Sequence, residues 1–276
     1  MQLISCHDGR LLALDTHSLG AGHQEGLASD RAFVTHLPAL DALAPGGAFA
    51  RGAVHEILSE SSHGTSLFLA MLLARRAMGV ESGGWKVEGK EDARFLPSTL
   101  HSPPSSSSVI WCDPRDELYP PALAAHGIPL ERLFLLHPRA AADQTWAVAE
   151  CLRCRGVAAV VASIDYRLSR VEARRLQLSA ERGGGVGLLL RAADRSSSAE
   201  HAAVTRWLVR PLPGERSVQR WSVQLIHGHG GRVGQAVILE HSRETNRVRA
   251  VEELADRSVE TKTSGGKPRI AERASA

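Results

Sequence analysis

The sequence contains little lysine and no strong excess of charge of either sign. Four of its 33 basic residues are lysines, Lys86, Lys90, Lys262 and Lys267, and the other 29 are arginines. The formal net charge is only +3 over 276 residues, so no strong field around the whole molecule favours nucleic acid. Arginine suits forked contacts with phosphate or carboxylate groups, although genomic base composition explains such a bias more simply.

Cysteines and long apolar runs are also scarce. The four cysteines, Cys6, Cys112, Cys151 and Cys154, are few enough to be reduced thiols. Cys151 and Cys154 have C-x-x-C spacing, but they fall within a helical pattern that offers no further zinc ligands, so we expect buried helix residues and no metal site. No apolar run could span a bilayer and no signal peptide opens the chain, which predicts a cytoplasmic protein without membrane contact.

Residues 51–75 read as a buried strand, a turn of small residues and an apolar helix. This is the layout of a phosphate-binding P-loop, whose motif G-x-x-x-x-G-K-[ST] closes backbone N–H groups, a lysine and a hydroxyl around phosphates and magnesium. The candidate loop consists of Ser59, Glu60, Ser61, Ser62, His63, Gly64, Thr65 and Ser66.

Neither register of the motif supplies a lysine. If Gly64 is the second glycine, Ser59 replaces the first, Thr65 takes the lysine position and Ser66 supplies the hydroxyl. If Thr65 supplies the hydroxyl, Leu58 and His63 replace the glycines and Gly64 replaces the lysine. A lost charge-assisted contact costs roughly 1.5–3 kcal/mol, although a helix N-terminus could still hold an anion weakly. We therefore expect a degenerate P-loop, no catalysis, and neither ATP nor magnesium as a cofactor.

From residue 109 onward the pattern alternates between short apolar strands and amphipathic helices. Such strands, separated by helices, indicate a parallel sheet covered on both faces, with right-handed crossovers. The expected strands are 109–112, 133–136, 157–163 and 186–190, and the expected helices are 118–126, 143–155 and 169–182. Segments 203–210, 220–227 and 235–240 alternate apolar and polar residues between Pro- and Gly-containing turns, which predicts antiparallel strands that finish the sheet.

Composition also predicts the domain organisation. Residues 1–30 lack sustained periodicity and are expected to be a flexible leader, and residues 31–250 form one domain. Residues 81–108 are rich in Gly, Pro and Ser, which predicts a mobile insertion, and residues 251–276 predict a disordered tail.

Residues 37–58 resemble the entry to the core of the RecA family, where a short helix and a glycine turn lead through a G-R-I-V-E-I strand into the P-loop. Within that superfamily the sequence is most similar to the ImuA family of bacterial mutagenesis cassettes, over about residues 37–240. The resemblance implies an α/β fold, a RecA-like core with a mainly parallel sheet flanked by helices and antiparallel strands at the C-terminal end. The N-terminal elements that RecA recombinases use to form filaments have no convincing equivalent.

The resemblance also places the positions of a RecA-type catalytic site. Asp113 matches the aspartate before the catalytic glutamate, which puts Arg115 at the glutamate, although a slip of one or two residues would bring Asp116 or Glu117 close. The magnesium-orienting aspartate falls at Ser163, with Asp165 two residues late. The glutamine that couples nucleotide to DNA falls at Arg191. These departures indicate a pseudo-ATPase with degenerate acidic and coupling positions.

The two loops that bind single-stranded DNA in RecA are short here. Four arginines, Arg167, Arg170, Arg191 and Arg195, could contact phosphates or a partner, with Tyr166 offering one stacking face. A solvated loop rim explains them equally well, so we expect weak or indirect single-stranded DNA contact at most.

Resemblance to ImuA implies a non-catalytic accessory factor in SOS-induced translesion DNA synthesis. The implied partners are an ImuB-like protein and an error-prone DnaE-type polymerase, with RecA filaments as a further candidate. Two alternatives remain: a DNA-dependent ATPase with an atypical P-loop, and a SulA-like inhibitor of cell division.

Overall fold

The computed structural model describes residues 31–60, 64–79, 107–193 and 203–251. It also describes three two-residue strands, β1 (Cys6–His7), β2 (Arg10–Leu11) and β6 (Lys86–Val87). The predicted leader, insertion and tail fall largely outside these residues, so the predicted domain boundaries stay predictions.

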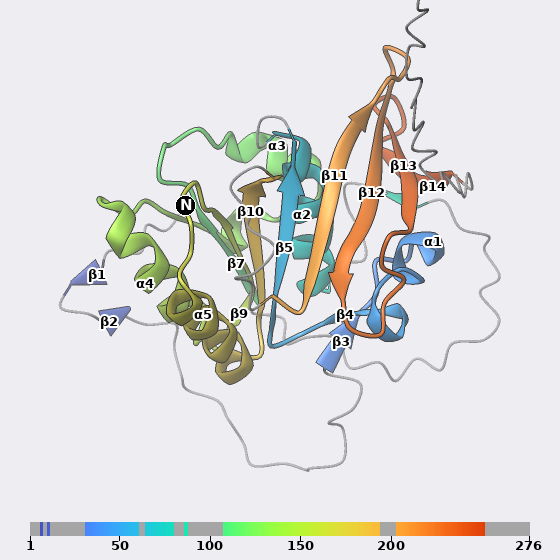
Figure 1. Ribbon diagram of the computed structural model, residues 1–276. Coiled ribbons are helices and arrows are strands. Elements are labelled where there is room, and N and C mark those ends of the chain that lie inside the picture. Colours follow the sequence, from blue (N-terminus) through green and yellow to red (C-terminus); the bar gives the residue numbers. More distant parts are fainter. Residues whose placement is uncertain are drawn as a thin grey trace, which may run out of the picture.

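One sheet of ten strands organises the protein, in the order β6-β14-β13-β12-β11-β5-β10-β9-β7-β8 (Figure 1). Six neighbouring strands, from β11 to β8, are parallel to one another. Their bounds are β5 (Ala53–Ser59), β7 (Ser108–Cys112), β8 (Leu133–Leu136), β9 (Val157–Ser163), β10 (Val186–Ala192) and β11 (Thr205–Leu212). Three of them, β7, β9 and β10, are mainly apolar and are buried along nearly their whole length, which is typical of parallel strands covered on both faces.

The C-terminal strands continue the same sheet in antiparallel fashion. They are β12 (Val218–Gly228), β13 (Ala236–Ser242) and β14 (Arg247–Val251), and β6 lies parallel to β14 at the edge. The predicted fold class is therefore confirmed. The structure differs from the prediction in one detail. Segment 203–210 was expected to be antiparallel, but β11 pairs parallel to β5 and antiparallel to β12, so it joins the parallel and the antiparallel parts of the sheet. Alternation of residues predicts a strand but not the direction of its neighbours.

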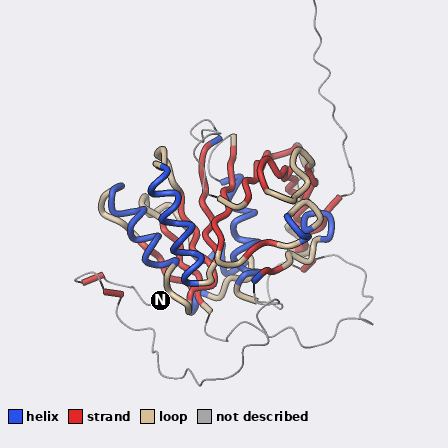
Figure 2. The backbone as a smooth tube through the Cα atoms, turned by 60° about the horizontal axis from the view of Figure 1, so that its bottom comes forward, coloured by secondary structure: helices blue, strands red, loops and turns tan. Residues whose placement is uncertain are grey.

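Helices cover both faces of the parallel strands, as Figures 1 and 2 show. One face is covered by α2 (Gly64–Ala77), which packs against β5, β9, β10 and β11. The other is covered by α4 (Ala141–Leu152) and α5 (Arg170–Gly183), which also pack against each other. The shorter elements are β3 (Ala32–Phe33), α1 (Pro38–Asp41), η2 (Pro45–Gly47), β4 (Phe49–Ala50), α3 (Pro120–Ala125) and η3 (Leu130–Arg132).

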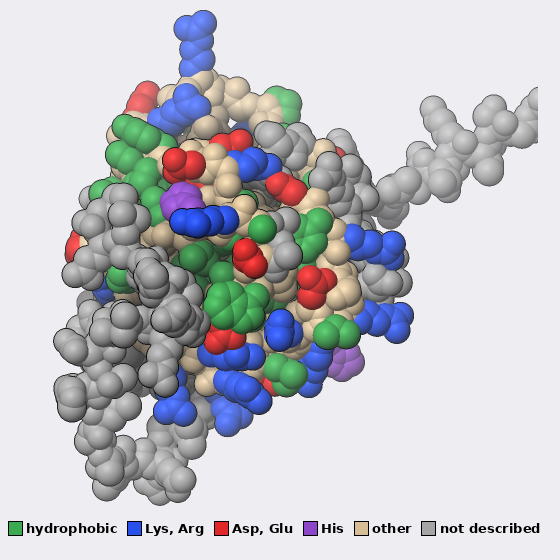
Figure 3. Space-filling view, turned by 90° about the vertical axis from the view of Figure 1, so that its left-hand side faces the viewer, with side chains coloured by type: hydrophobic (Ala, Val, Ile, Leu, Met, Phe, Trp, Pro, Cys, Tyr) green, Lys and Arg blue, Asp and Glu red, His purple; other side chains and the backbone are tan. Residues whose placement is uncertain are grey.

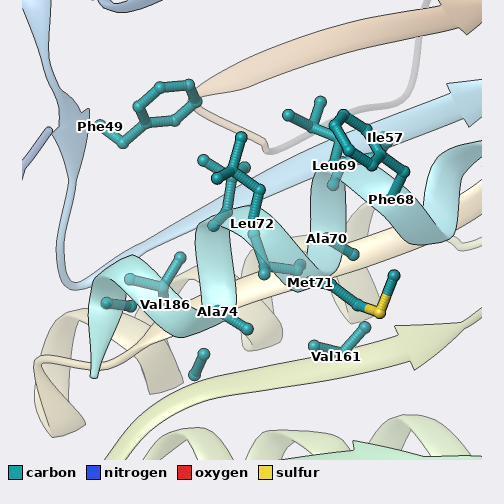
Figure 4. Close-up of a cluster of buried hydrophobic side chains, with 14 of the residues drawn as sticks. Phe49, Ile57, Phe68, Leu69, Ala70, Met71, Leu72, Ala74, Val161 and Val186 are labelled. Atoms are coloured by element: carbon teal, nitrogen blue, oxygen red, sulfur yellow. The ribbon is translucent and has the colours of Figure 1, made fainter. Parts of the chain in front are cut away.

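The α2 helix is apolar nearly all round and lies at the centre of the larger hydrophobic core (Figure 4). Leu69, Leu72 and Leu73 are fully buried. Phe68 stacks on Trp221 of β12 with ring centroids 3.8 Å apart, which ties α2 to the C-terminal strands. A helix of this composition is stable only when it is buried. None of the helices in the described part of the chain is long and apolar enough to cross a membrane.

A buried hydrogen-bond network fixes β5 against its neighbours on the α2 face. His55 is fully buried, and its Nε2 lies 2.9 Å from the carbonyl oxygen of Ala50. A proton on Nε2 donates to that carbonyl, so Nδ1 accepts from the Thr205 hydroxyl at 2.7 Å. The indole of Trp207 donates to the same hydroxyl oxygen, also at 2.7 Å. Burial lowers the pKa of His55 from 6.5 to about 4, so this network contains a neutral imidazole.

Candidate functional site

The carboxyl ends of the parallel strands meet at one edge of the sheet, where α/β proteins commonly bind ligands. Strand β5 ends at Ser59, β9 ends at Ser163, β7 leads into Asp113, and Arg191 is the penultimate residue of β10. The structure therefore brings these predicted positions to the same edge, beside the start of α2 at Gly64.

The predicted strand and helix on either side of the P-loop position are present. Ser59 and Ser66 are both fully buried, and Thr65 is partly buried. Glu60 is exposed, and its carboxylate accepts a hydrogen bond from Arg210 Nε at 2.8 Å. Ser61, Ser62 and His63 lie outside the described residues, so the conformation of the loop itself stays untested.

No lysine in the described residues could replace the missing one. Lys86 is on β6, which is separated from β5 by β14, β13, β12 and β11. At about 4.8 Å per strand, that separation amounts to about 24 Å across the sheet. The side chain of a lysine cannot cover this distance. The phosphate-neutralising residue of a P-loop is therefore missing from the described chain.

Asp113 has a structural role at the end of β7. Its carboxylate is buried, and its Oδ2 accepts a hydrogen bond from the backbone N–H of Leu118 at 2.6 Å. Its own N–H donates to the carbonyl oxygen of Leu136 at 2.9 Å. These bonds fix the turn that leads from β7 into α3, so they account for a carboxylate at this position without a metal.

Arg115 lies at the position that the resemblance gives to a catalytic glutamate, and it makes ion pairs with two acids. Its NH1 group is 2.6 Å from Asp165 Oδ2, and its Nε is 2.9 Å from Glu117 Oε2. These contacts join the segments that follow β7 and β9. Each partner is partly exposed, so each pair contributes less than about 1 kcal/mol of stability. The main effect of these two ion pairs is electrostatic, because the guanidinium of Arg115 offsets the negative charge of Glu117 and Asp165.

Ser163 and Tyr166 are held by α4 through hydrogen bonds. Gln144 donates from its side-chain amide to the carbonyl oxygen of Ser163 at 2.6 Å. The hydroxyls of Thr145 and Tyr166 are also hydrogen-bonded, and burial raises the pKa of Tyr166. Burial raises the pKa of the nearby Cys112 thiol to about 12, which makes it unreactive as a nucleophile. This corner of the site is therefore a packed interface between α4 and the strand ends.

Arg191 differs most from the expectation, because it is buried instead of lying on a loop rim. Its side chain is 3% exposed, and its NH1 group lies 3.0 Å from Glu56 Oε1. The other carboxylate oxygen of Glu56 accepts from Arg206 Nε at 2.7 Å. The three residues belong to β5, β10 and β11 and form a buried arginine–glutamate–arginine triad. An accessible DNA or partner contact by Arg191 is therefore not supported.

Glu56 and Arg206 are not among the residues predicted from the sequence, although a signal for them was present. Each is a charged residue within an apolar strand, and they are direct neighbours across the β5–β11 pair. Buried charges are rarely tolerated without a partner. A glutamate within a mainly apolar strand therefore predicts an arginine partner on a neighbouring strand, and Arg206 is such a partner.

The remaining predicted contact residues lie apart from the triad. Arg167 is exposed in the loop after β9, and Arg170 is the exposed first residue of α5. Arg195 lies outside the described residues. Across the described ranges, no group of three or more His, Cys, Asp or Glu side chains could hold a metal ion.

The described side chains do not fit a magnesium-bound nucleotide. The lysine is missing, Asp165 faces Arg115, and Asp113 accepts a backbone hydrogen bond. The fold and the site thus define an α/β protein with a mainly parallel sheet, in which ion pairs lie at the carboxyl edge of the strands.

Comparison with known proteins gives a more specific result. No protein-family model matches the chain. The chain is 26% identical over 250 residues to Protein ImuA of Caulobacter vibrioides, strain NA1000 / CB15N, and equally to Protein ImuA of strain ATCC 19089 / CIP 103742 / CB 15. The match covers 83% of this chain and 92% of each relative. It supports assignment of the chain to the ImuA family, in agreement with the sequence resemblance.

Proposed function

We propose that this protein is a non-catalytic accessory factor in damage-induced translesion DNA synthesis and acts by binding other proteins. The similarity to proteins named ImuA supports this theme. The family resemblance suggests an ImuB-like protein and an error-prone DnaE-type polymerase as partners, and RecA filaments as a third. In this role the sheet and α2 form a scaffold, and the partners supply the chemistry.

The ion pair between Arg115 and Asp165 is the observation that carries the non-catalytic part of the proposal. Phosphoryl transfer needs carboxylates that hold magnesium and cations that face the phosphates. Here a cation stands 2.6 Å from the nearest candidate carboxylate, and the described chain brings no lysine to α2. In this arrangement the carboxylate of Asp165 is paired with a guanidinium, which makes it a weaker candidate for holding magnesium.

Nucleotide binding and hydrolysis by the purified full chain test the non-catalytic part. We expect no ATP binding in the micromolar range and no turnover above a denatured-protein blank, with or without single-stranded DNA and RecA. A Thr65→Lys, Arg115→Glu variant is assayed beside the wild type, since it adds a lysine at the P-loop position and replaces the guanidinium of Arg115 with a carboxylate. Magnesium-dependent turnover by the wild-type chain would establish an ATPase and overturn this part.

Binding to purified partners tests the accessory role separately. The full chain would be immobilised and exposed to an ImuB-like protein, a DnaE-type polymerase and RecA filaments from the same cells. We expect stable retention of at least one of them. If none is retained, the accessory role is wrong, whatever the nucleotide assay shows.

A further inference from the structure

A groove of about 480 Å³ runs along the outer surface of α5, from its first residue Arg170 to Arg182, beside Arg153, which follows α4. Five of the eight described residues that line it are arginines, and none is Asp or Glu. These arginines are Arg153, Arg170, Arg174, Arg175 and Arg182. Figure 3, which faces this side of the molecule, shows Lys and Arg side chains gathered around exposed apolar ones. We call this surface the arginine groove.

The arginine groove also contains an apolar stripe. Val171 is 79% exposed and Leu178 is 39% exposed, and both lie on α5. They are seven residues apart, so they share one face of the helix with Arg174 and Arg175 between them. The opposite face of α5 is buried against the sheet through residues that include Leu176 and Ala180. The outer stripe is therefore not needed for the core of the domain.

The walls of the groove are fixed in place. Ser169 and Glu172 form a capping box at the start of α5, in which Glu172 Oε2 accepts from Ser169 N at 2.8 Å. At the other end, a Cβ atom on Gly183 would lie 1.9 Å from the carbonyl oxygen of Leu152. Only glycine permits this approach, which holds the end of α5 against the end of α4. The groove is thus a preformed surface between two packed helices.

The arginines of the groove outnumber the acids near them. Arg174 lies 3.8 Å from Glu181, and both side chains are largely exposed. Arg153 pairs with Glu150 of the same helix. The four arginines of α5 face only two glutamates in that helix, Glu172 and Glu181. Positive charge is therefore left over on this surface for a ligand that carries carboxylates or phosphates.

The shape and the lining favour carboxylates on a protein helix. Binding of single-stranded nucleic acid depends on stacking of bases on aromatic rings, and none of the described lining residues is aromatic. A docked amphipathic helix instead presents apolar side chains three or four residues apart, which matches the stripe of Val171 and Leu178. Arginine pairs with carboxylates in a forked geometry, and its stem adds apolar surface.

We infer that the arginine groove docks an acidic amphipathic helix from a partner protein. Its carboxylates pair with the arginines, and its apolar side chains cover Val171 and Leu178. This inference rests on the proposed function and names the chemistry of the partner segment. The groove lies on the helix side of the molecule, so docking there does not require the strand edge to bind anything.

The test uses the full chain and four fluorescent probes in an anisotropy titration. The first is a 16-residue helical peptide with leucines three or four residues apart and glutamates between them. The second is its scrambled sequence, the third has lysine in place of every glutamate, and the fourth is a 15-nucleotide oligodeoxythymidine. Hydrogen exchange of the bound complex shows whether α5 is the protected element.

We expect the acidic peptide to bind at least tenfold more tightly than its scrambled form, a difference of about 1.4 kcal/mol. The Arg174→Glu, Arg182→Glu variant should lose at least tenfold in affinity for it and should gain affinity for the lysine peptide. An Arg216→Glu, Arg232→Glu variant is a matched control, since both arginines are exposed and lie in the C-terminal half, away from the groove. It should bind the acidic peptide like the wild type. Equal thermal unfolding of both variants would show that they fold.

Three results would overturn the inference: equal binding of the acidic and scrambled peptides, unchanged binding by the groove variant, or tighter binding of the oligonucleotide that depends on Arg174 and Arg182. Failure of the proposed function is distinguishable from these. If the acidic peptide binds the groove but no ImuB-like protein, polymerase or RecA filament is retained, the inference stands and the accessory role fails. If partners are retained equally by the wild type and the groove variant, and the peptide fails, the accessory role stands alone.

Discussion

The buried triad of Glu56, Arg191 and Arg206 gives the sharpest test of how the sheet is held together. The glutamate is 3% exposed and pairs with both arginines, at 3.0 and 2.7 Å. Glu56→Gln keeps the shape of the side chain but removes its charge, and one guanidinium would then face an amide nitrogen. The two buried arginines would then lose the carboxylate with which both of them pair. Breaking a buried pair in this way costs about 3–5 kcal/mol.

This cost is a large share of the roughly 5–15 kcal/mol by which domains are stable. At roughly 2–4 °C per kcal/mol for a chain of this length, the expected fall in Tm is about 6–20 °C. Thermal unfolding followed by circular dichroism measures it. A variant that replaces all three residues, Glu56→Leu, Arg191→Met and Arg206→Met, should recover most of the loss, because no buried charge then remains.

Glu240 provides a comparison in which the partners are more exposed. Its own side chain is 11% exposed, and it pairs with two arginines, Arg220 at 2.8 Å and Arg249 at 2.7 Å, which are 32% and 57% exposed. Because water reaches these arginines more readily than those of the triad, Glu240→Gln should cost less than Glu56→Gln. If Glu56→Gln is as mild as Glu240→Gln, or if the triple variant is no more stable than Glu56→Gln, the reasoning about buried charge is wrong.

Three further predictions concern pH, thiol reactivity and the core. Burial lowers the pKa of His55 to about 4, so its contribution to stability is complete above its ordinary pKa of 6.5 and is lost as the pH falls from 6.5 towards 4. Tm should therefore fall as the pH is lowered from 7.5 to 5, and it should fall less steeply in the His55→Gln variant. An equal fall of Tm with pH in the variant and the wild type would contradict this. Burial raises the pKa of Cys112 to about 12, so alkylation at pH 8 should modify it only after unfolding, as peptide mass spectrometry would show. Phe68→Ala removes the stacking contact with Trp221 and should cost about 3–5 kcal/mol in urea unfolding, and a loss below 1 kcal/mol would mean that this contact does not anchor α2.

Much of the fold could be predicted from the sequence, because buried parallel strands are recognised by their high content of apolar residues. Strands β5, β9 and β10 consist largely of apolar residues, which is typical of parallel strands buried on both faces, and the structure confirms them. The direction of β11 was not predictable in this way. Its alternating residues are compatible with either a parallel or an antiparallel neighbour, and the choice depends on the route of the chain between β10 and β11.

The candidate site was predicted less well, because charged residues depend on register. Arg191 is near the end of an apolar strand, and its sequence position cannot distinguish a loop rim from a buried pair. The answer depends on Glu56, which is 135 residues away along the chain but lies on the neighbouring strand β5, two residues from the position opposite Arg191. Arg115 and Asp165 are likewise 50 residues apart. Ion pairs between residues so far apart in the sequence cannot be predicted until the order of the strands in the sheet is known.

The distribution of charge over the molecule connects the two proposals. A nucleotide site must keep some cations and carboxylates available at the strand edge, so that they can meet phosphates and magnesium. Here Arg115, Arg191 and Arg210 each pair with a glutamate or aspartate of the same chain at or near that edge. On α5 the arginines exceed the acids, and the excess surrounds exposed Val171 and Leu178. Arginines that are paired at the strand edge but exceed the acids on a helix face agree with the proposal that the protein binds partners through its helices, while β5 and α2 contribute to the core.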